Sequence, residues 1–235
     1  PVEPLRRDEA RLDGEVAAAA ARDLRDLRVR RLRHVHHLAH LDQLEHLAQT
    51  IREDGGRAHT FGIDARDEDQ MTALFDQIET EIGPIEIMVF NIGANVNFPI
   101  EETSARVYRK VWEMAAFAGF LAGREAARKM IPRQRGTVIF TGATASVRGG
   151  TGYSAFAGAK FALRALAQSM ARELGPKNIH VAHALIDGAI DSPFIREILP
   201  DVDALRSEDR ILDPDAIAQA YVMLHRQPRS AWTQE

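Results

Sequence analysis

Apolar and polar residues alternate in short blocks from Gly56 onward, and the period of the pattern switches between that of a strand and that of a helix. The run RAHTFGID predicts a strand that ends at Asp64, and IEIMVF predicts a second strand whose near-continuous apolar residues are typical of burial on both faces. Between them, a helix that Gly83-Pro84 terminates is predicted by one apolar face: Met71, Leu74, Phe75, Ile78 and Ile82.

The same alternation continues to the end of the chain. The pattern predicts a helix over 104–130, the strand GTVIFTG, a helix over 155–174, the strand NIHVAHALI, and a last helix from about 213 or 214 to 224. Short apolar strands that alternate with helices are typical of a parallel sheet with helices on both faces. The sequence therefore predicts an α/β fold built on a doubly wound parallel sheet.

The N-terminal part follows a different pattern. Leucine and other apolar residues recur every three or four positions as far as Ile51, and the region lacks proline after Pro4, so we predict a long helix from about Val16 to about Glu53, ended by Gly55-Gly56. His36 and His40 would lie one turn apart on this helix. Two histidines without a carboxylate or thiolate are a weak metal signal, and we predict no metal site.

Residues 1–40 also have an unusual amino-acid composition. They use only nine residue types, and all nine can be encoded by codons beginning with G or C. Reading a GC-rich gene one frame out of register would produce this bias, so a frameshifted segment is one hypothesis and a natural Arg/Ala-rich helix is the other. The nucleotide sequence upstream of the Leu41 codon would distinguish them. We divide the chain into an atypical helical segment, 1–40, and one α/β domain, 41–235.

The composition narrows the class of protein. An apolar fraction of 45% with 27% charged residues is that of an ordinary globular chain of 235 residues. No long apolar run or signal peptide is evident, so we expect a soluble cytoplasmic protein without a membrane partner. Zero cysteines exclude disulfides and thiolate chemistry, and a net charge of −4 argues against nucleic-acid binding.

Ligands of doubly wound sheets bind beyond the carboxyl ends of the strands, so the segments that follow each strand are the candidate site. These segments are Asp64, FNIGAN over 90–95, TGATAS over 141–146 and DGAIDS over 187–192. Each offers glycine, small residues or one polar side chain where a flat ligand can approach the backbone.

Together with AFAGAK and AQSMARELGPKNIHV, these segments resemble the short-chain dehydrogenase/reductase family from about Leu41 to Ser192. The resemblance implies a Rossmann-like fold and an NAD or NADP cofactor. It implies that Asp64 caps the adenine and that the other cofactor contacts come from Asn91, Gly93, Lys160, Gly188 and Ile190. It leaves NAD versus NADP undecided, because the family's discriminating residues would fall within residues 1–40.

One departure from the family concerns the phosphate-binding loop. The family's first strand and its G-x-x-x-G-x-G loop should lie within residues 1–40, and that sequence contains no such loop. The glycines of this loop let backbone N–H groups hold the pyrophosphate, so their absence predicts weakened cofactor binding. A missing first strand would also open the middle of the sheet.

A second departure concerns the catalytic residues. The family uses Tyr-x-x-x-Lys, and the aligned residues are Phe156 and Lys160. The assisting serine aligns with Ala143, although the nearby Thr144 and Ser146 leave that register open, and the helix asparagine aligns with Ala115. Of the family's four catalytic residues, only the lysine is present, as Lys160.

Tyr153 is a candidate substitute for the missing tyrosine. It precedes Lys160 by seven residues, about 10.5 Å along a helix, and at that distance the lysine charge would lower the pKa of the phenol only slightly.

The expected function is therefore NAD(P)-dependent oxidoreduction of a small carbonyl or alcohol, weakened in this chain. The alternative is a non-catalytic oligomer subunit or ligand-binding protein of the same fold. The resemblance also implies a homodimer or homotetramer built on the two small-residue helices AAFAGFLAG and AFAGAKFAL. The sequence does not identify the substrate. The chain ends abruptly at Glu235, so a truncated C-terminus is one interpretation.

Overall fold

The computed structural model describes residues 34–36 and 41–235, which belong to two compact units. One unit comprises Ile63–Asp187 with Met223–Glu235, and the other comprises the described residues up to Gly62 with Gly188–Val222. The fold is α/β with parallel strands throughout the described residues, as the sequence predicted.

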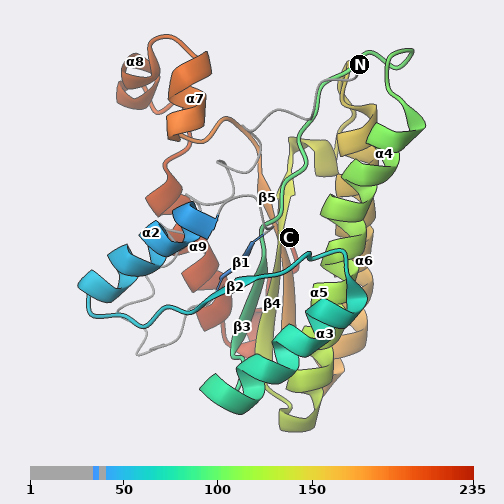
Figure 1. The fold of residues 1–235 in the computed structure, drawn as a ribbon, viewed down its shortest axis with the longest axis vertical. Coiled ribbons are helices and arrows are strands. Elements are labelled where there is room, and N and C mark those ends of the chain that lie inside the picture. The colour runs from blue at the N-terminus through green and yellow to red at the C-terminus, as the bar shows by residue number, and fades with distance from the viewer. Residues whose placement is uncertain (1–33, 37–40) are drawn as a thin grey trace. The chain divides into compact units, whose positions relative to one another are not determined.

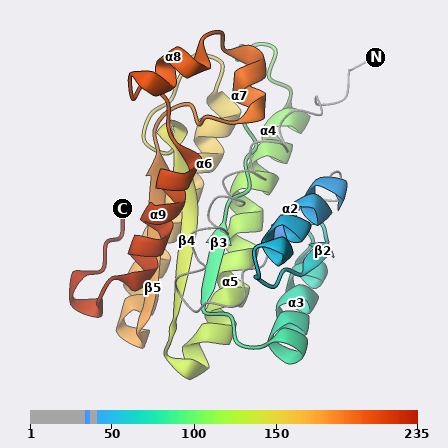
Figure 2. The same cartoon turned by 90° about the vertical axis from the view of Figure 1, so that its left-hand side faces the viewer.

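The larger unit is built on a parallel sheet in the order β3-β4-β5. Its strands are β3 (Ile87–Phe90), β4 (Gly136–Ala143) and β5 (Ile179–Ile186), and Figure 2 shows β4 in the middle. The register pairs Phe90 with Phe140 and Ala143 with Ile186. All three strands were predicted, and their shared direction brings their carboxyl ends to one edge.

The four helices of this unit lie on one side of its strands in Figure 1. They are α3 (Glu68–Gln77), α4 (Ala105–Trp112), α5 (Ala118–Met130) and α6 (Ser154–Leu174). A wider π-helical turn, η4 (Glu113–Phe117), joins α4 to α5, so the predicted helix over 104–130 is confirmed as one interrupted helix. A second π-helical turn, η3 (Ile78–Ile82), extends α3. Short 3-10 turns complete the unit: η5 (Ile131–Arg133), η6 (Thr144–Ser146), η7 (Gly175–Lys177) and η8 (Arg229–Ala231).

The core of this unit lies between the sheet and α5 and α6. Val138, Ile139 and Phe140 on β4 have no exposed surface, and neither do Leu121 on α5 and Leu163 on α6. Gly119 allows the close approach of the two helices, because a Cβ atom there would lie 2.5 Å from the Leu163 Cδ1 atom. On α3, Met71, Leu74 and Phe75 of the predicted apolar face are buried.

The outer edge of β5 is covered by the last residues of the chain. The backbone N–H of His183 donates to the Gln234 carbonyl at 2.8 Å, and a His180 ring nitrogen lies 2.8 Å from the Thr233 carbonyl. The Glu235 carboxylate lies 2.9 Å from His183 Nδ1 and binds Arg164 on α6. Trp232 stacks on the His180 ring at 4.9 Å, so both side chains and backbone hold this segment to the strand.

The smaller unit contains β1 (His34–His36), α2 (Leu41–Glu53), β2 (Thr60–Gly62) and two short helices, α7 (Pro193–Ile198) and α8 (Val202–Ser207). Helix α9 (Pro214–Arg226) confirms the last predicted helix and continues into the larger unit at Met223. The strand predicted to reach Asp64 ends at Gly62 instead.

The prediction of a continuous helix from Val16 to Glu53 was wrong at residues 34–36. His34–His36 forms a strand that pairs in parallel with Thr60–Gly62, so backbone hydrogen bonds to β2 take the place of helical ones. Within the described residues the helix spans Leu41–Glu53, and its end at Glu53 is the predicted one. The rest of the predicted helix, with His40, lies outside the described residues.

No helix in the described part of the chain is both long and apolar enough to cross a bilayer.

An ion-pair cluster ties α7 and α8 together. The Asp191 carboxylate, 4% exposed, accepts hydrogen bonds from Arg196 at 2.6 and 2.9 Å, and Arg206 Nε lies 3.3 Å away. These contacts, above all the Arg196 hydrogen bond, hold the pKa of Asp191 below its usual value.

The lowered pKa of Asp191 predicts a pH-dependent stability of this helix pair. Because the folded-state pKa is the lower one, the stabilisation is complete above the unfolded pKa of about 3.9 and is lost as the pH falls through the folded value. We expect amide hydrogen exchange in α7 and α8 to accelerate in that range. Asp191→Asn should remove the pH dependence, whereas Asp203→Asn, at an 86% exposed carboxylate, should leave it. Equal profiles for wild type and Asp191→Asn would contradict the prediction.

Candidate active site

The carboxyl ends of β3, β4 and β5 form one edge of the sheet of the larger unit. Asn91 follows β3, Thr144 follows β4 and Asp187 follows β5. Because Ala143 pairs with Ile186, the next two residues, Thr144 and Asp187, leave the sheet side by side. Residues from three of the four segments that the sequence singled out, Asn91, Thr144 and Asp187, therefore lie at this edge.

Lys160 on α6 is buried beneath this edge, with a residue exposure of 3%. Its ammonium group donates to the Thr141 carbonyl at 2.9 Å and to the Ile92 carbonyl at 3.4 Å. The charge is thus held by carbonyl oxygens from the end of β4 and from the segment that follows β3. A buried ammonium bound in this way cross-links two strand ends and fixes its own position.

Phe156 lies one helical turn before Lys160, on the same face of α6. The Lys160 ammonium is 5.8 Å from the centre of the Phe156 ring, at the distance of a cation–π contact. The Phe156 ring is buried at 8% exposure. The residue pair that the Tyr-x-x-x-Lys spacing singled out is therefore close together, but the aromatic ring has no hydroxyl group to donate.

The structure distinguishes the three residues that were candidates for the assisting hydroxyl group. Ala143 has none, and the Ser146 hydroxyl is fully buried and accepts the Ala143 N–H at 3.1 Å. Thr144 is only partly buried, and its hydroxyl donates to the carboxylate of the exposed Asp187. Of the two hydroxyl groups, that of Thr144 is the one at the open end of the strands.

Ala115 lies in the middle of the π-helical turn η4 and has no exposed surface. Turns of this kind are frequent at functional sites because they change which side chains a helix presents. At this position the side chain is a methyl group packed in the interior. It supplies no hydrogen-bonding group where the family's asparagine would stand.

Tyr153 directly precedes α6 and lies outside the helix. The preceding Gly152 has a φ of 81°, and a Cβ atom there would lie 2.5 Å from Asn97 Oδ1, so glycine is needed both for the turn and for the close approach. The residue one turn from Lys160 on its helix is Phe156, and the substitution of Tyr153 for it stays a prediction.

Asp64, the predicted adenine ligand, is bound by a neighbour. The Arg66 guanidinium donates to both carboxylate oxygens, at 2.9 and 2.6 Å, and the Arg66 N–H donates at 3.0 Å. The hydrogen bond to Asp64 raises the pKa of Arg66. An incoming amino group would therefore share this carboxylate with a bidentate arginine.

The other predicted cofactor ligands belong to different parts of the structure. Asn91 and Gly93 lie in the segment after β3, next to the carbonyl of Ile92 that Lys160 contacts. Gly188 and Ile190 belong to the smaller unit, where Ile190 forms a β-bridge with Leu212.

The pairs Asp64–Arg66 and Thr144–Asp187 were not predicted. An aspartate two residues before an arginine is a weak sequence signal. Thr144 and Asp187 are 43 residues apart and meet only because β4 and β5 are paired in register.

The chain is similar to known proteins over the region that contains these segments. The family model for short chain dehydrogenases matches residues 30–203. Cyclopentanol dehydrogenase of Comamonas testosteroni is 28% identical over 170 residues, which cover 72% of this chain and 66% of that protein. The chain thus spans about two thirds of the length of such curated relatives.

Solved structures extend the comparison. A short-chain dehydrogenase from Rhodopseudomonas palustris is 45% identical, with a TM-score of 0.78, and the match covers 94% of this chain and 91% of that one. A gluconate 5-dehydrogenase from Burkholderia cenocepacia, in complex with NADP and tartrate, has a TM-score of 0.76 at 21% identity and covers 89% and 83%. This second likeness concerns the fold alone.

Proposed function

The chain belongs to the short-chain dehydrogenase family, and we propose that it is an NAD(P)-dependent oxidoreductase that acts on a small carbonyl or alcohol with weakened proton transfer. The observation that carries the proposal is Lys160, whose buried ammonium group lies at the shared edge of the strand ends. A relative that acts on cyclopentanol and a neighbour of similar fold that binds NADP support this class of substrate and cofactor.

We propose that the residues at the strand ends hold such a cofactor. Lys160 would hold the ribose, and the segment of Asn91 and Gly93 would lie alongside it, while Asp64 would receive the adenine together with Arg66. A bound nicotinamide would supply or accept the hydride. The sequence of residues 1–40 still lacks the glycine-rich loop, so we propose that the pyrophosphate is held weakly.

Proton transfer is the step that this chain handles differently. Phe156 cannot donate a proton, and the Thr144 hydroxyl already donates its hydrogen to the Asp187 carboxylate, so the proton for the substrate oxygen would come from water. We propose that the Asp187 carboxylate accepts the hydroxyl hydrogen of an alcohol substrate at the open edge and so orients its oxygen. Binding and orientation would then account for most of the remaining activity.

The second candidate function is a non-catalytic subunit or ligand-binding protein of the same fold. It is favoured by the apolar side chains at three catalytic positions, Ala115, Ala143 and Phe156. A homodimer or homotetramer is proposed under either function. Exposed aromatic residues on α4, α5 and α6 support it, at 41%, 40% and 43% exposure respectively: Trp112, Phe120 and Phe161. We propose the cytoplasm as the location.

The oxidoreductase proposal is tested by titrating NADH and NADPH while the nicotinamide fluorescence is recorded. We expect saturable binding that Lys160→Met weakens about tenfold or more, because a charge-assisted hydrogen bond contributes about 1.5–3 kcal/mol. Lys177→Met is the matched control, since that lysine lies on η7 and is 42% exposed. If the folded wild-type protein binds neither nucleotide, the oxidoreductase proposal fails and the non-catalytic alternative is favoured.

A further inference from the structure

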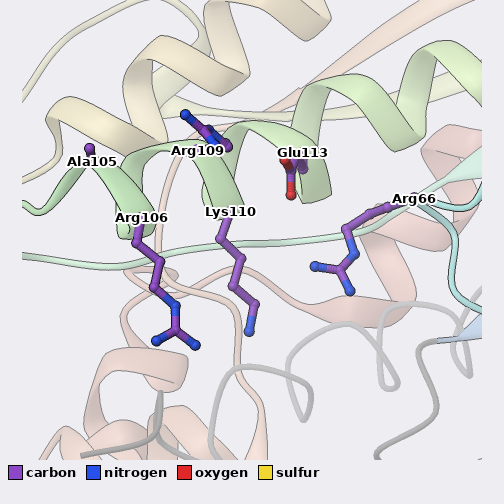
Figure 3. Close-up of a pocket in the computed structure, with 6 residues that line it drawn as sticks. All are labelled: Arg66, Ala105, Arg106, Arg109, Lys110 and Glu113. Atoms are coloured by element: carbon purple, nitrogen blue, oxygen red, sulfur yellow. The ribbon is translucent and has the colours of Figure 1, made fainter. Parts of the chain in front are cut away.

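A pocket of about 480 Å³ lies beside the first turns of α4, within the larger unit. Its size is within the usual range for small-molecule sites. Figure 3 shows its lining, which comes from α4, from η4 and from the loop after β2: Arg66, Ala105, Arg106, Arg109, Lys110 and Glu113. The Arg106 and Lys110 side chains extend to the same side of the helix, and the Arg66 guanidinium lies across from them, whereas Arg109 turns back toward the other side (Figure 3).

The pocket is strongly positive in a chain whose net charge is −4. Four cationic side chains line it, against the single carboxylate of Glu113. The charge of Arg66 is compensated by its ion pair with Asp64, in which Arg66 Nη2 lies 2.6 Å from Asp64 Oδ2. Within 34–36 and 41–235, Arg106 and Lys110 form no ion pair of this kind. The pocket therefore concentrates positive charge that its described neighbours leave unbalanced.

The spacing of these cations costs stability to the helix that carries them. Arg106 and Lys110 are four residues apart, so their like charges face each other across one turn. Arg106 also lies in the first turn of α4, which contains no acidic residue and where the helix dipole disfavours a cation. An anion in the pocket would relieve both repulsions at once.

We infer that this pocket binds the phosphate group of a small ligand. Guanidinium groups match the oxygens of a phosphate by paired hydrogen bonds, and a lysine adds a mobile point charge. Among the described residues that line the pocket none is aromatic, so these residues recognise charge and not a stacked base. The phosphate belongs either to inorganic phosphate and small phosphate esters or to the proposed dinucleotide, and the binding itself does not depend on the proposed oxidoreductase function.

Calorimetric titration with inorganic phosphate at low, matched ionic strength tests the inference. We expect saturable binding to the wild-type chain that the double variant Arg106→Gln/Lys110→Gln weakens at least tenfold, since two charge-assisted contacts are removed. The control is Arg135→Gln/Lys177→Gln, which removes the same charge at two exposed cations elsewhere, 73% and 42% exposed, and should stay within about twofold. Circular dichroism checks folding, and Arg106→Gln alone, with an intermediate effect, replaces the double variant if it misfolds.

Competition then distinguishes the sources of the phosphate. Displacement by NADP⁺ but not by NAD⁺ assigns the pocket to the ribose phosphate of the dinucleotide, displacement by both assigns it to the pyrophosphate, and displacement by neither assigns it to a separate phosphate ester. The inference is overturned if the wild-type chain binds no phosphate saturably, or if the double variant binds as tightly as the wild type.

Discussion

Phe156→Tyr is expected to raise the rate of carbonyl reduction about 10²-fold, because a positioned general acid contributes about 10²–10⁴ in rate. The substituted residue would lie one turn from Lys160, whose ammonium is already 5.8 Å from the ring at this position. A nearby ammonium charge stabilises the phenolate and so lowers the pKa of a new phenol. The rate is measured with saturating NADH or NADPH and a series of small ketones.

The matched control for this gain is Phe161→Tyr. That residue is on the same helix but is 43% exposed, and a hydroxyl group there should leave the rate unchanged. A pH profile adds a readout that packing alone would not move, since the Phe156→Tyr variant should acquire a titration that the wild type lacks. An unchanged rate would show that Ala143, Ala115 or the substrate limits the reaction and not the missing phenol.

Phe140→Ala is expected to lower the free energy of unfolding by about 3–5 kcal/mol, the usual cost of truncating a buried phenylalanine. The Phe140 ring has no exposed surface and contacts the Phe90 ring, with centroids 6.2 Å apart. A Cβ atom at Gly123 would lie 2.9 Å from Phe140 Cζ, so α5 is fitted closely to this ring. The cavity would be left at the centre of the sheet. Urea denaturation followed by circular dichroism measures the loss.

Phe161→Ala serves as the control for the stability effect. It removes the same ring from a position that is 43% exposed and should cost about 1 kcal/mol or less, measured at a protein concentration at which wild type and variant are in the same oligomeric state. A similar loss for the two variants would mean that the sheet and α5 are not the cooperative core of this unit.

The central part of the fold could be predicted because each element carries a local signal. The strands of the sheet are apolar runs bounded by glycine or polar residues, and α6 has an apolar face through Leu163 and Ala167 that packs without exposed surface. The short helices α7 and α8 were missed. Their six residues each are too few for a periodic signal, and they depend on the contacts of Asp191 with Arg196 and Arg206.

At His34–His36 the local sequence signal predicted the wrong element. Arginine, leucine and alanine around it favour a helix, and only pairing with Thr60–Gly62, which lies 26 residues further along, selects the extended form. The residues of the site also differ in whether their proximity could be predicted from the sequence. Phe156 and Lys160 share a helix face and could be paired from their spacing, whereas Thr144 with Asp187, and Arg66 with Lys110, depend on strand register and on helix placement.

The segment that lies along β5 has a further consequence for the behaviour of the protein in concentrated solution. A bare strand edge presents a row of unsatisfied N–H and C=O groups to which another chain can add as a strand. The Gln234 carbonyl occupies the His183 N–H, and the Glu235 carboxylate, bound by Arg164 and His183, anchors the segment over the same edge. The residues that bind this edge therefore also act against intermolecular strand addition and aggregation.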